Sequence, residues 1–424
     1  MIIREGGKMN RRDFLKGAAA AAALSALGGF GVNELLAAAP KKVRKKGPQV
    51  TRKPYKNSDF TIPLLGFGMM RLPTRGFRGV DDSRAEAMVD RAMEAGLNYF
   101  DTAYMYHGGD SEKFLGRALS RYPRESYILT SKLPIWQLYS ESEMEKTFSE
   151  QLRRTKAGYF DFYFLHWLNE GNWNHAEEVK AYDFLKNKQL QGLIRRVGFS
   201  YHGGPRGLET IAKAHEWELA QVQMNFRDWD TNSRSLYEVL TRYRIPISVM
   251  GPLGGGSLAS LSAEAEAVLR KAAPDASPAS WMLRFIGSLP NVQIVLSGMS
   301  TMDQLQDNIR TFAPFTPLTD AERTVLRQAA EVSRWRRTGS SRCTTCRYCM
   351  PCPVGVQIPD VFRHYNRYKE DGDKAKFRKN YLALDPKGRA SACVNCKVCL
   401  KKCPQKIDIP RHLKEIAAEC KSLS

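Results

Sequence analysis

The chain has 424 residues, with 65 lysines and arginines against 44 aspartates and glutamates, which gives a formal net charge of +21. This length allows one large domain and one small domain, and the mean hydropathy of −0.43 excludes a polytopic membrane protein. Because no nucleic-acid-binding motif accompanies the positive charge, we expect a solvated basic surface that attracts acidic partners and binds no nucleic acid.

Residues 1–39 have the pattern of an export signal. Twin arginines stand in Asn10–Lys16, a weakly apolar stretch rich in Ala and Gly covers Gly17–Val32, and small residues fill Ala37–Ala39. The pattern closely resembles a twin-arginine signal with a cleavage site. We expect the folded protein to leave through the twin-arginine translocase for the periplasm, with an uncleaved anchor facing the periplasm as the alternative. A basic linker, 40–58, follows the signal.

Residues 59–330 alternate short apolar runs with segments of helical periodicity, such as Ser83–Ala95 and Glu141–Lys156. Eight strand–helix units over about 250 residues predict an α/β fold, a closed (β/α)8 TIM barrel. A doubly wound open sheet is the alternative, but no GxGxxG follows the first strand. The predicted strands are Leu64–Met69, Leu97–Asp101, Tyr127–Ser131, Phe162–His166, Leu193–Ser200, Leu219–Asn225, Ile245–Met250 and Gln293–Ser297.

Polar side chains gather at three consecutive strand ends of the predicted barrel. Asp101, Lys132 and His166 end the second, third and fourth strands, and Tyr106 lies in the loop after Asp101. In such barrels the chemistry sits at the C-terminal ends of the strands. A lysine beside a phenol stabilises the phenolate and lowers the phenol pKa, so that the tyrosine acts as a general acid near neutral pH. Each residue alone is more often a satisfied polar group, but four together indicate a catalytic site.

Eight of the nine cysteines form two runs, Cys-x2-Cys-x2-Cys-x2-Cys-Pro and Cys-x2-Cys-x2-Cys-x3-Cys-Pro. The second run matches the two-cluster ferredoxin pattern, and the first is one residue short before its last cysteine. We predict two [4Fe–4S] clusters in a small, mainly helical, ferredoxin-like domain, 343–424, after a linker, 331–342. Structural zinc usually takes four ligands in two widely separated pairs, and disulfide frameworks belong to short chains, so both alternatives fit less well.

The two runs form an internal repeat, because Cys352–Pro359 aligns with Cys403–Pro410. The repeat predicts that each run lends its last cysteine to the other cluster. Cys420 lies in a helical tail and is expected to be a spare thiol, and a helix is expected near 358–370. The predicted ligands are Cys343, Cys346, Cys349 and Cys403 for the first cluster, and Cys393, Cys396, Cys399 and Cys352 for the second.

Motifs in the barrel region resemble those of the aldo/keto reductases. The resemblance covers roughly residues 60–315, and the motifs occur in order along the chain. With the two cysteine runs, the architecture looks like an iron–sulfur branch of that family. The motifs are Phe100–Ala103 with Tyr106, Ser111–Gly116, Thr130–Lys132, Asp161–Trp167 and Gly192–Ser200.

The resemblance implies that Asp101, Tyr106, Lys132 and His166 form a catalytic tetrad, with Tyr106 as proton donor and a bound NADP(H) or NAD(H) as hydride carrier. Met250 stands where the family commonly stacks a tyrosine on the nicotinamide, although a thioether can also pack on a ring. The implied cofactor contacts are Ser200, Gln223, Met250, Pro252, Leu253, Ser297, Gly298, Gln304 and Asn308.

These expectations favour an exported oxidoreductase that interconverts a small carbonyl and an alcohol, and whose clusters exchange electrons with an acidic redox partner. Two one-electron clusters together could hold the two electrons of a hydride. Two alternatives stay open: an electron-transfer protein whose barrel is a non-catalytic scaffold, and clusters that are purely structural.

Overall fold

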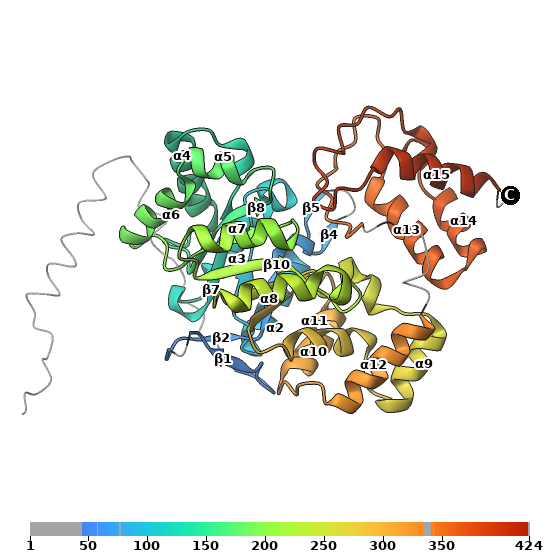
Figure 1. The fold of residues 1–424 in the computed structure, drawn as a ribbon, viewed down its shortest axis with the longest axis horizontal. Helices are drawn as coiled ribbons and strands as arrows, with labels where there is room; N and C mark the ends of the chain where they lie inside the picture. Colours follow the sequence, from blue (N-terminus) through green and yellow to red (C-terminus); the bar gives the residue numbers. More distant parts are fainter. Residues whose placement is uncertain (1–44, 57, 76–77, 334–340, 342, 423–424) are drawn as a thin grey trace, which may run out of the picture. The chain divides into compact units, whose positions relative to one another are not determined.

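The computed structural model describes residues 45–56, 58–75, 78–333, 341 and 343–422 (Figure 1). The predicted export signal and most of the linker predicted at 331–342 lie outside the described residues. Within the described part of the chain, every helix is too short or too polar to span a lipid bilayer.

Eight parallel strands close into a barrel, as predicted. The strand order around the barrel is β10-β11-β12-β3-β6-β7-β8-β9, so each strand neighbours the next one along the chain, and β12 pairs with β3 to complete the ring. The strands are β3 (Leu65–Gly68), β6 (Tyr99–Asp101), β7 (Ile128–Leu133), β8 (Phe162–Leu168), β9 (Val197–Tyr201), β10 (Leu219–Gln223), β11 (Ile247–Met250) and β12 (Val292–Ser297).

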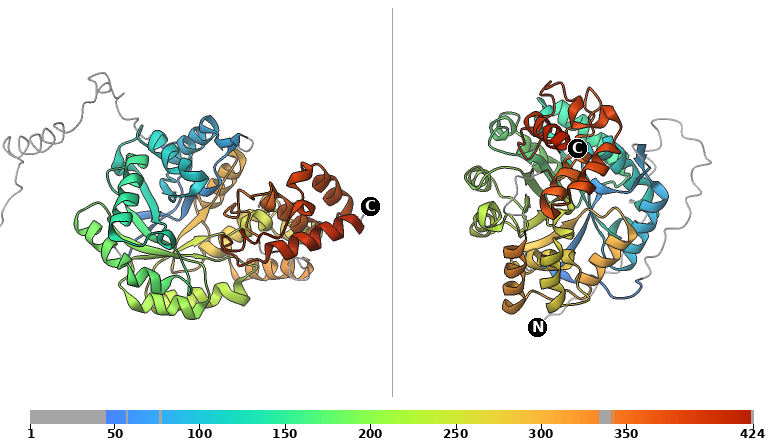
Figure 2. Two further views of the ribbon diagram at one scale, coloured as in Figure 1. Left: turned by 90° about the horizontal axis from the view of Figure 1, so that it is seen from above. Right: turned by 90° about the vertical axis from the view of Figure 1, so that its right-hand side faces the viewer.

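Helices surround the strands (Figure 2). Several begin at a side chain that accepts a hydrogen bond from a backbone N–H of the first turn, as Ser140 does for Glu143 and Thr319 for Glu322. The helices of this region are α2 (Asp82–Glu94), α3 (Asp110–Leu119), α4 (Glu141–Thr155), α5 (Trp173–Glu178), α6 (Ala181–Leu190), α7 (Pro205–Ala214), α8 (Arg234–Arg242), α9 (Ala263–Ala272), α10 (Pro278–Gly287), α11 (Met302–Phe312) and α12 (Asp320–Val332).

An antiparallel hairpin that the sequence patterns did not reveal covers the N-terminal end of the barrel. It consists of β1 (Arg52–Pro54) and β2 (Thr61–Pro63), and its Tyr55 packs in one apolar cluster with Phe162 and other residues from the starts of the strands. A second small hairpin, β4 (Thr74–Arg75) and β5 (Arg78–Val80), follows β3. The β1–β2 hairpin covers the end at which the strands start. Because the strands are parallel, their polar C-terminal ends lie together at the opposite end.

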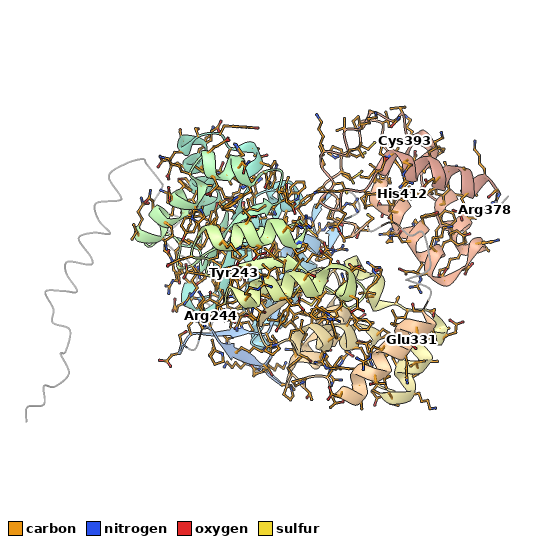
Figure 3. All side chains as sticks on the ribbon, viewed as in Figure 1. Tyr243, Arg244, Glu331, Arg378, Cys393 and His412 are labelled. Carbon is orange, nitrogen blue, oxygen red and sulfur yellow. The ribbon has the colours of Figure 1, made fainter. Side chains whose placement is uncertain are left out.

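The cysteine-rich segment, residues 343–422, has a hydrophobic core of its own. It contains α13 (Ile358–Asp371), α14 (Lys374–Leu382) and α15 (Ile409–Ser422) and, within the described residues, no strand. The cysteine runs precede α13 and α15. The segment is therefore mainly helical, as predicted, and the expected helix near 358–370 is present. Figure 3 shows Cys393 and His412 on this segment.

Candidate active site and cysteine clusters

The four residues of the expected tetrad lie together at the C-terminal ends of β6, β7 and β8. Lys132 donates hydrogen bonds to Asp101 Oδ1 (2.6 Å) and to the main-chain oxygen of Thr102 (2.7 Å), and its Nζ lies 3.4 Å from the hydroxyl of Tyr106. The ring of His166 lies edge-on to that of Tyr106, with centroids 6.1 Å apart. The side chains of all four residues are buried.

Burial decides the protonation of this group. It raises the pKa of Tyr106 well above its ordinary value, so the phenol holds its proton at neutral pH. The sequence argument expected Lys132 to lower this pKa, but loss of water outweighs the ammonium here. Burial and the charge of Lys132 hold the pKa of His166 well below its usual range, so its imidazole is neutral. The buried Nδ1 of His166 has no hydrogen-bond partner among the described residues.

A buried carboxylate behind β7 holds the strand that carries Lys132. Glu112 accepts hydrogen bonds from Ser131 Oγ (2.7 Å), Gln151 Nε2 (2.6 Å) and Arg154 Nη1 (3.2 Å). Gln151 also donates to the main-chain oxygen of Lys132 at 3.2 Å. The network fixes the backbone beneath the lysine and thereby the position of its ammonium.

A cavity of about 310 Å³ opens above the tetrad, which is large enough for a small ligand. Asp101, Tyr106 and His166 line it, whereas Lys132 lies beneath its wall. All nine residues expected to contact a nicotinamide line the same cavity: Ser200, Gln223, Met250, Pro252, Leu253, Ser297, Gly298, Gln304 and Asn308. The structure thus brings together residues that are spread over about 100 positions of the sequence.

The cysteine-rich segment covers part of this cavity, which the sequence analysis missed. Its Thr344, Cys346, Tyr348, Pro404 and Gln405 line the cavity together with the barrel residues. Contacts that join segments so distant in sequence leave no signal in local patterns. The position of Tyr348 between two predicted cluster ligands was the one available hint.

Two of these residues, Tyr348 and Gln405, contact barrel side chains on which the predicted chemistry depends. The hydroxyl of Tyr348 lies near that of Tyr106 and interacts with it electrostatically, and its ring lies 5.6 Å from that of Trp167, the residue after His166. Gln405 donates a 2.8 Å hydrogen bond to the side-chain oxygen of Gln223, an expected nicotinamide contact. The segment therefore contacts both the proton donor and the expected cofactor site.

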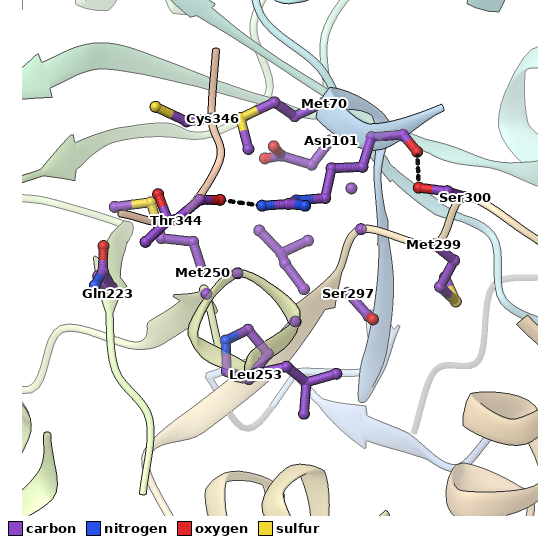
Figure 4. A pocket seen from close by; sticks show the side chains of 18 of the residues that line it. Met70, Asp101, Gln223, Met250, Leu253, Ser297, Met299, Ser300, Thr344 and Cys346 are labelled. Carbon is purple, nitrogen blue, oxygen red and sulfur yellow. Dashed lines mark hydrogen bonds between the residues drawn. The ribbon is translucent and has the colours of Figure 1, made fainter. Parts of the chain in front are cut away.

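Arg71 also lines the cavity and was not predicted. It ends the short 3-10 helix Met69–Arg71 after β3, and its guanidinium reaches the first cysteine run. Figure 4 shows two of its hydrogen bonds, from the guanidinium to Thr344 and from Ser300 to its main-chain oxygen.

The eight clustered cysteines surround two further cavities. One is lined by Cys343, Cys346, Cys349 and Cys403. The other is lined by Cys352, Cys393, Cys396 and Cys399, with Cys349 between the two. Burial, and then the neighbouring thiolates of the same set, raise the pKa of Cys343 to about 12 and that of Cys399 to about 11. Thiolates held so close together in apolar surroundings need a positively charged centre.

The donor set fits iron–sulfur clusters better than a single ion. Within the described residues, no three His, Cys, Asp or Glu side chains converge tightly enough to hold one metal ion. The cysteines are instead spread around two cavities, four around one and five around the other, with Cys349 shared. Cys403 lies with the first run and Cys352 with the second, which is compatible with the crossed assignment. Four thiolates around a cavity form the ligand set of a [4Fe–4S] cluster.

The repeat is also visible in the backbone. Thr345 and Arg347 in the first run have positive φ, and so do Asn395 and Lys397 at the same offsets in the second. Each run leads into a helix with proline in its first turn. The remaining cysteine, Cys420, is buried in α15, apart from both cavities.

Each of the three parts predicted from the sequence matches a known family of sequences. Residues 64–331 match the sequence model of the aldo/keto reductase family, residues 342–407 match that of the 4Fe-4S dicluster domain, and residues 8–28 match that of the twin-arginine translocation signal. An aldo-keto reductase of Mycolicibacterium smegmatis is 30% identical over 262 residues, which cover 60% of this chain and 83% of that protein.

Two solved structures resemble the barrel. Aldo-keto reductase AKR11C1 from Bacillus halodurans, in its holo form, aligns with a TM-score of 0.56 and 24% identity over 66% of this chain and 96% of that one. An aldo/keto reductase from Klebsiella pneumoniae in complex with NADP and acetate aligns with a TM-score of 0.53 and 21% identity over 63% of this chain and 91% of that one. At these identities the likeness concerns the fold. The family match spans well over half of the sequence, and the chain therefore belongs to the aldo/keto reductase family, as an oxidoreductase with a 4Fe-4S domain and a twin-arginine signal.

Proposed function

We propose that the protein interconverts a small carbonyl compound and its alcohol by hydride transfer with NADP(H) or NAD(H), and that Asp101, Tyr106, Lys132 and His166 form its catalytic tetrad. One observation carries the proposal. The buried Asp101–Lys132–Tyr106 chain and a neutral His166 lie at the floor of a cavity lined by every residue expected to contact the nicotinamide. The cofactor complex of the Klebsiella relative supports the choice of cofactor.

In the proposed reaction Tyr106 donates its proton to the carbonyl oxygen. Lys132, held by Asp101, stabilises the phenolate that remains, and neutral His166 orients the carbonyl. A nicotinamide bound against Met250 would supply the hydride. Because the hydroxyl of Tyr348 already contacts that of Tyr106, the carbonyl oxygen must share or replace this contact. The cysteine-rich segment thereby helps to determine which substrates fit.

We further propose that the eight cysteines hold two [4Fe–4S] clusters, in the crossed sets Cys343, Cys346, Cys349, Cys403 and Cys352, Cys393, Cys396, Cys399. Bound clusters would carry single electrons to or from a redox partner, and the basic surface favours an acidic one. The proposed place of action is the periplasm, which the match to a twin-arginine signal supports.

One observation favours a second candidate, an electron-transfer protein with a non-catalytic barrel. Tyr348 lies against Tyr106, and Gln405 occupies a hydrogen-bonding position on Gln223, where substrate and cofactor would bind. If these contacts do not open, substrate and cofactor cannot reach the two side chains, and the barrel serves as a scaffold.

The deciding experiment compares the wild type with Tyr106→Phe in anaerobically purified protein. We expect nicotinamide-dependent reduction of small aldehydes to fall at least about 10²-fold in the variant, the usual contribution of a general acid, with unchanged cofactor binding and iron content. Tyr237→Phe, which removes a hydroxyl from α8, is the matched control. Equal activity in Tyr106→Phe and the wild type would show that the tetrad is not catalytic.

A further inference from the structure

Arg71 connects the cavity to the first cysteine run. Its guanidinium Nη2 donates hydrogen bonds to the main-chain oxygen of Thr344 and, at 2.8 Å, to Thr345 Oγ1. Both threonines lie between Cys343 and Cys346. The main-chain oxygen of Arg71 accepts a 2.7 Å hydrogen bond from Ser300 Oγ. The residue is therefore fixed at both ends, with its charge directed toward the cysteines (Figure 4).

Among the residues that the structure describes, no aspartate or glutamate forms an ion pair with Arg71. Asp101 lines the same cavity, but it accepts hydrogen bonds from Lys132 at 2.6 Å and from Gln221 at 2.8 Å. Burial lowers the pKa of Arg71, and the thiolates of Cys346 and Cys343 oppose this effect. A part-buried guanidinium without a carboxylate needs another anion.

Two anions are expected near the side chain. One is the set of thiolates of the first cysteine run, whose loop the guanidinium contacts. The other is the phosphate of a bound cofactor, because the segment expected to hold it lies against the arginine stem: a Cβ added to Gly298 would stand only 2.8 Å from Arg71 Cδ. Glycine at this position lets the arginine stem lie against the wall of the cavity. A phosphate-bearing ligand in the cavity would lie within the field of the same guanidinium.

We propose that Arg71 is a counter-ion shared by the first cysteine set and a dinucleotide in the cavity, so that cofactor binding and the reduction potential of the first cluster are linked. The inference rests on the proposed function, since it requires both a nicotinamide cofactor and a cluster. Reduction adds one negative charge to the cysteine-bound centre, and a bound anion competes for the charge that stabilises it. Cofactor binding therefore lowers the midpoint potential, and reduction weakens binding by the same factor.

The experiment is an anaerobic redox titration of the full protein with dithionite and mediators, followed by electron paramagnetic resonance. It is run with and without 1,4,5,6-tetrahydro-NADP, a cofactor analogue that transfers no hydride. We expect the analogue to lower one of two midpoints and leave the other unmoved. A tenfold difference in affinity for the analogue between the oxidised and the reduced protein would correspond to a midpoint shift of about 59 mV for a one-electron centre. The unmoved midpoint serves as an internal reference.

Arg71→Met should lower that same midpoint in the absence of analogue, and adding the analogue should no longer move it. The affinity for the analogue, measured by protein fluorescence, should become independent of cluster oxidation state. Arg363→Met is the matched control, because Arg363 on α13 does not line the cavity and its charge is paired with Asp360 at 2.7 Å. It should keep the response of the midpoint to the analogue. Arg71→Lys, which keeps the positive charge but loses the paired N–H donors of the guanidinium, should retain part of the midpoint shift caused by the analogue.

An analogue that binds the wild type without moving either midpoint, or that moves a midpoint equally in Arg71→Met, would overturn the inference and leave the proposed function intact. Failure of both this analogue and its NAD counterpart, 1,4,5,6-tetrahydro-NAD, to bind would overturn both. If Arg71→Met alone loses its iron, the inference is still tested by the midpoint shift that the analogue causes in the wild type and by the size of that shift in Arg71→Lys.

Discussion

Tyr348, between the predicted cluster ligands Cys346 and Cys349, lines the barrel cavity beside Tyr106, and its hydroxyl interacts with that of Tyr106. A side chain from the cysteine-rich segment thus lies next to the proposed proton donor. Trp167 holds the ring of Tyr348 from the barrel side. The candidate site is therefore built from both parts of the chain.

Tyr348→Phe should lower the KM for a small aldehyde by about fivefold, because the substrate oxygen no longer competes with the Tyr348 hydroxyl for a contact worth about 1 kcal/mol. Steady-state kinetics at saturating cofactor measures this. Tyr381→Phe, in the core of the cysteine-rich segment, is the control and should leave KM unchanged. An unchanged or raised KM in Tyr348→Phe would mean that the contact does not compete with substrate.

Glu112→Ala should destabilise the barrel by about 3 kcal/mol, since it leaves the part-buried Arg154 without one of its carboxylate partners and removes the acceptor for Ser131 and Gln151. Chemical denaturation followed by tryptophan fluorescence gives the change. Glu141→Ala, at the exposed start of the same α4 that carries Gln151, is the control. A loss below about 1 kcal/mol would show that the network contributes little.

Acidification should destabilise the fold through His202, whose pKa burial and the charge of Lys132 lower to about 4. The unfolded state binds the proton below about pH 6.5 and the folded state does not, so this stability is present above that pH and is lost as the pH falls toward 4. Denaturation measured between about pH 7.5 and about pH 5.5 should show a weaker pH dependence of the free energy of unfolding in His202→Gln than in the wild type. The same slope in variant and wild type would contradict the assignment.

The crossed cluster assignment predicts which cysteine variants behave alike. Cys352→Ala and Cys393→Ala should remove the same paramagnetic signal on reduction, whereas Cys343→Ala and Cys403→Ala should remove the other one. Iron content should fall from about eight atoms per chain toward about four in each case. Cys420→Ala is the control and should keep both signals. If Cys352→Ala instead removed the signal that Cys343→Ala removes, each run would ligate its own cluster.

The barrel was predictable from the sequence because parallel strands in a closed barrel are short apolar runs at regular spacing. The errors lie at strand ends. The strand predicted from Leu193 begins at Val197, because the apolar Leu193 and Ile194 belong to the preceding turn and to an isolated bridge between Ile194 and Phe160. The β1–β2 hairpin was missed because its strands have only three residues each and end in proline.

The tetrad was predictable because parallel strands bring consecutive strand ends together. The roles of Tyr348, Gln405 and Arg71 were not, since they depend on how the cysteine-rich segment lies on the barrel. The pKa of Tyr106 was misjudged for a similar reason. The sequence indicates the charge of Lys132 near Tyr106, but the burial that raises the pKa of Tyr106 depends on residues more than 200 positions away.

The hydrogen bonds that complete the cavity join residues 182 to 274 positions apart, from Gln223 with Gln405 to Arg71 with Thr345. Each of these contacts needs both the folded barrel and the cysteine loops in their final shape. The walls of the cavity are therefore complete only when both parts of the chain have folded. We expect a chain that lacks its metal centres to have an incomplete cavity as well, so that failed maturation yields an inactive enzyme rather than an uncoupled reductase.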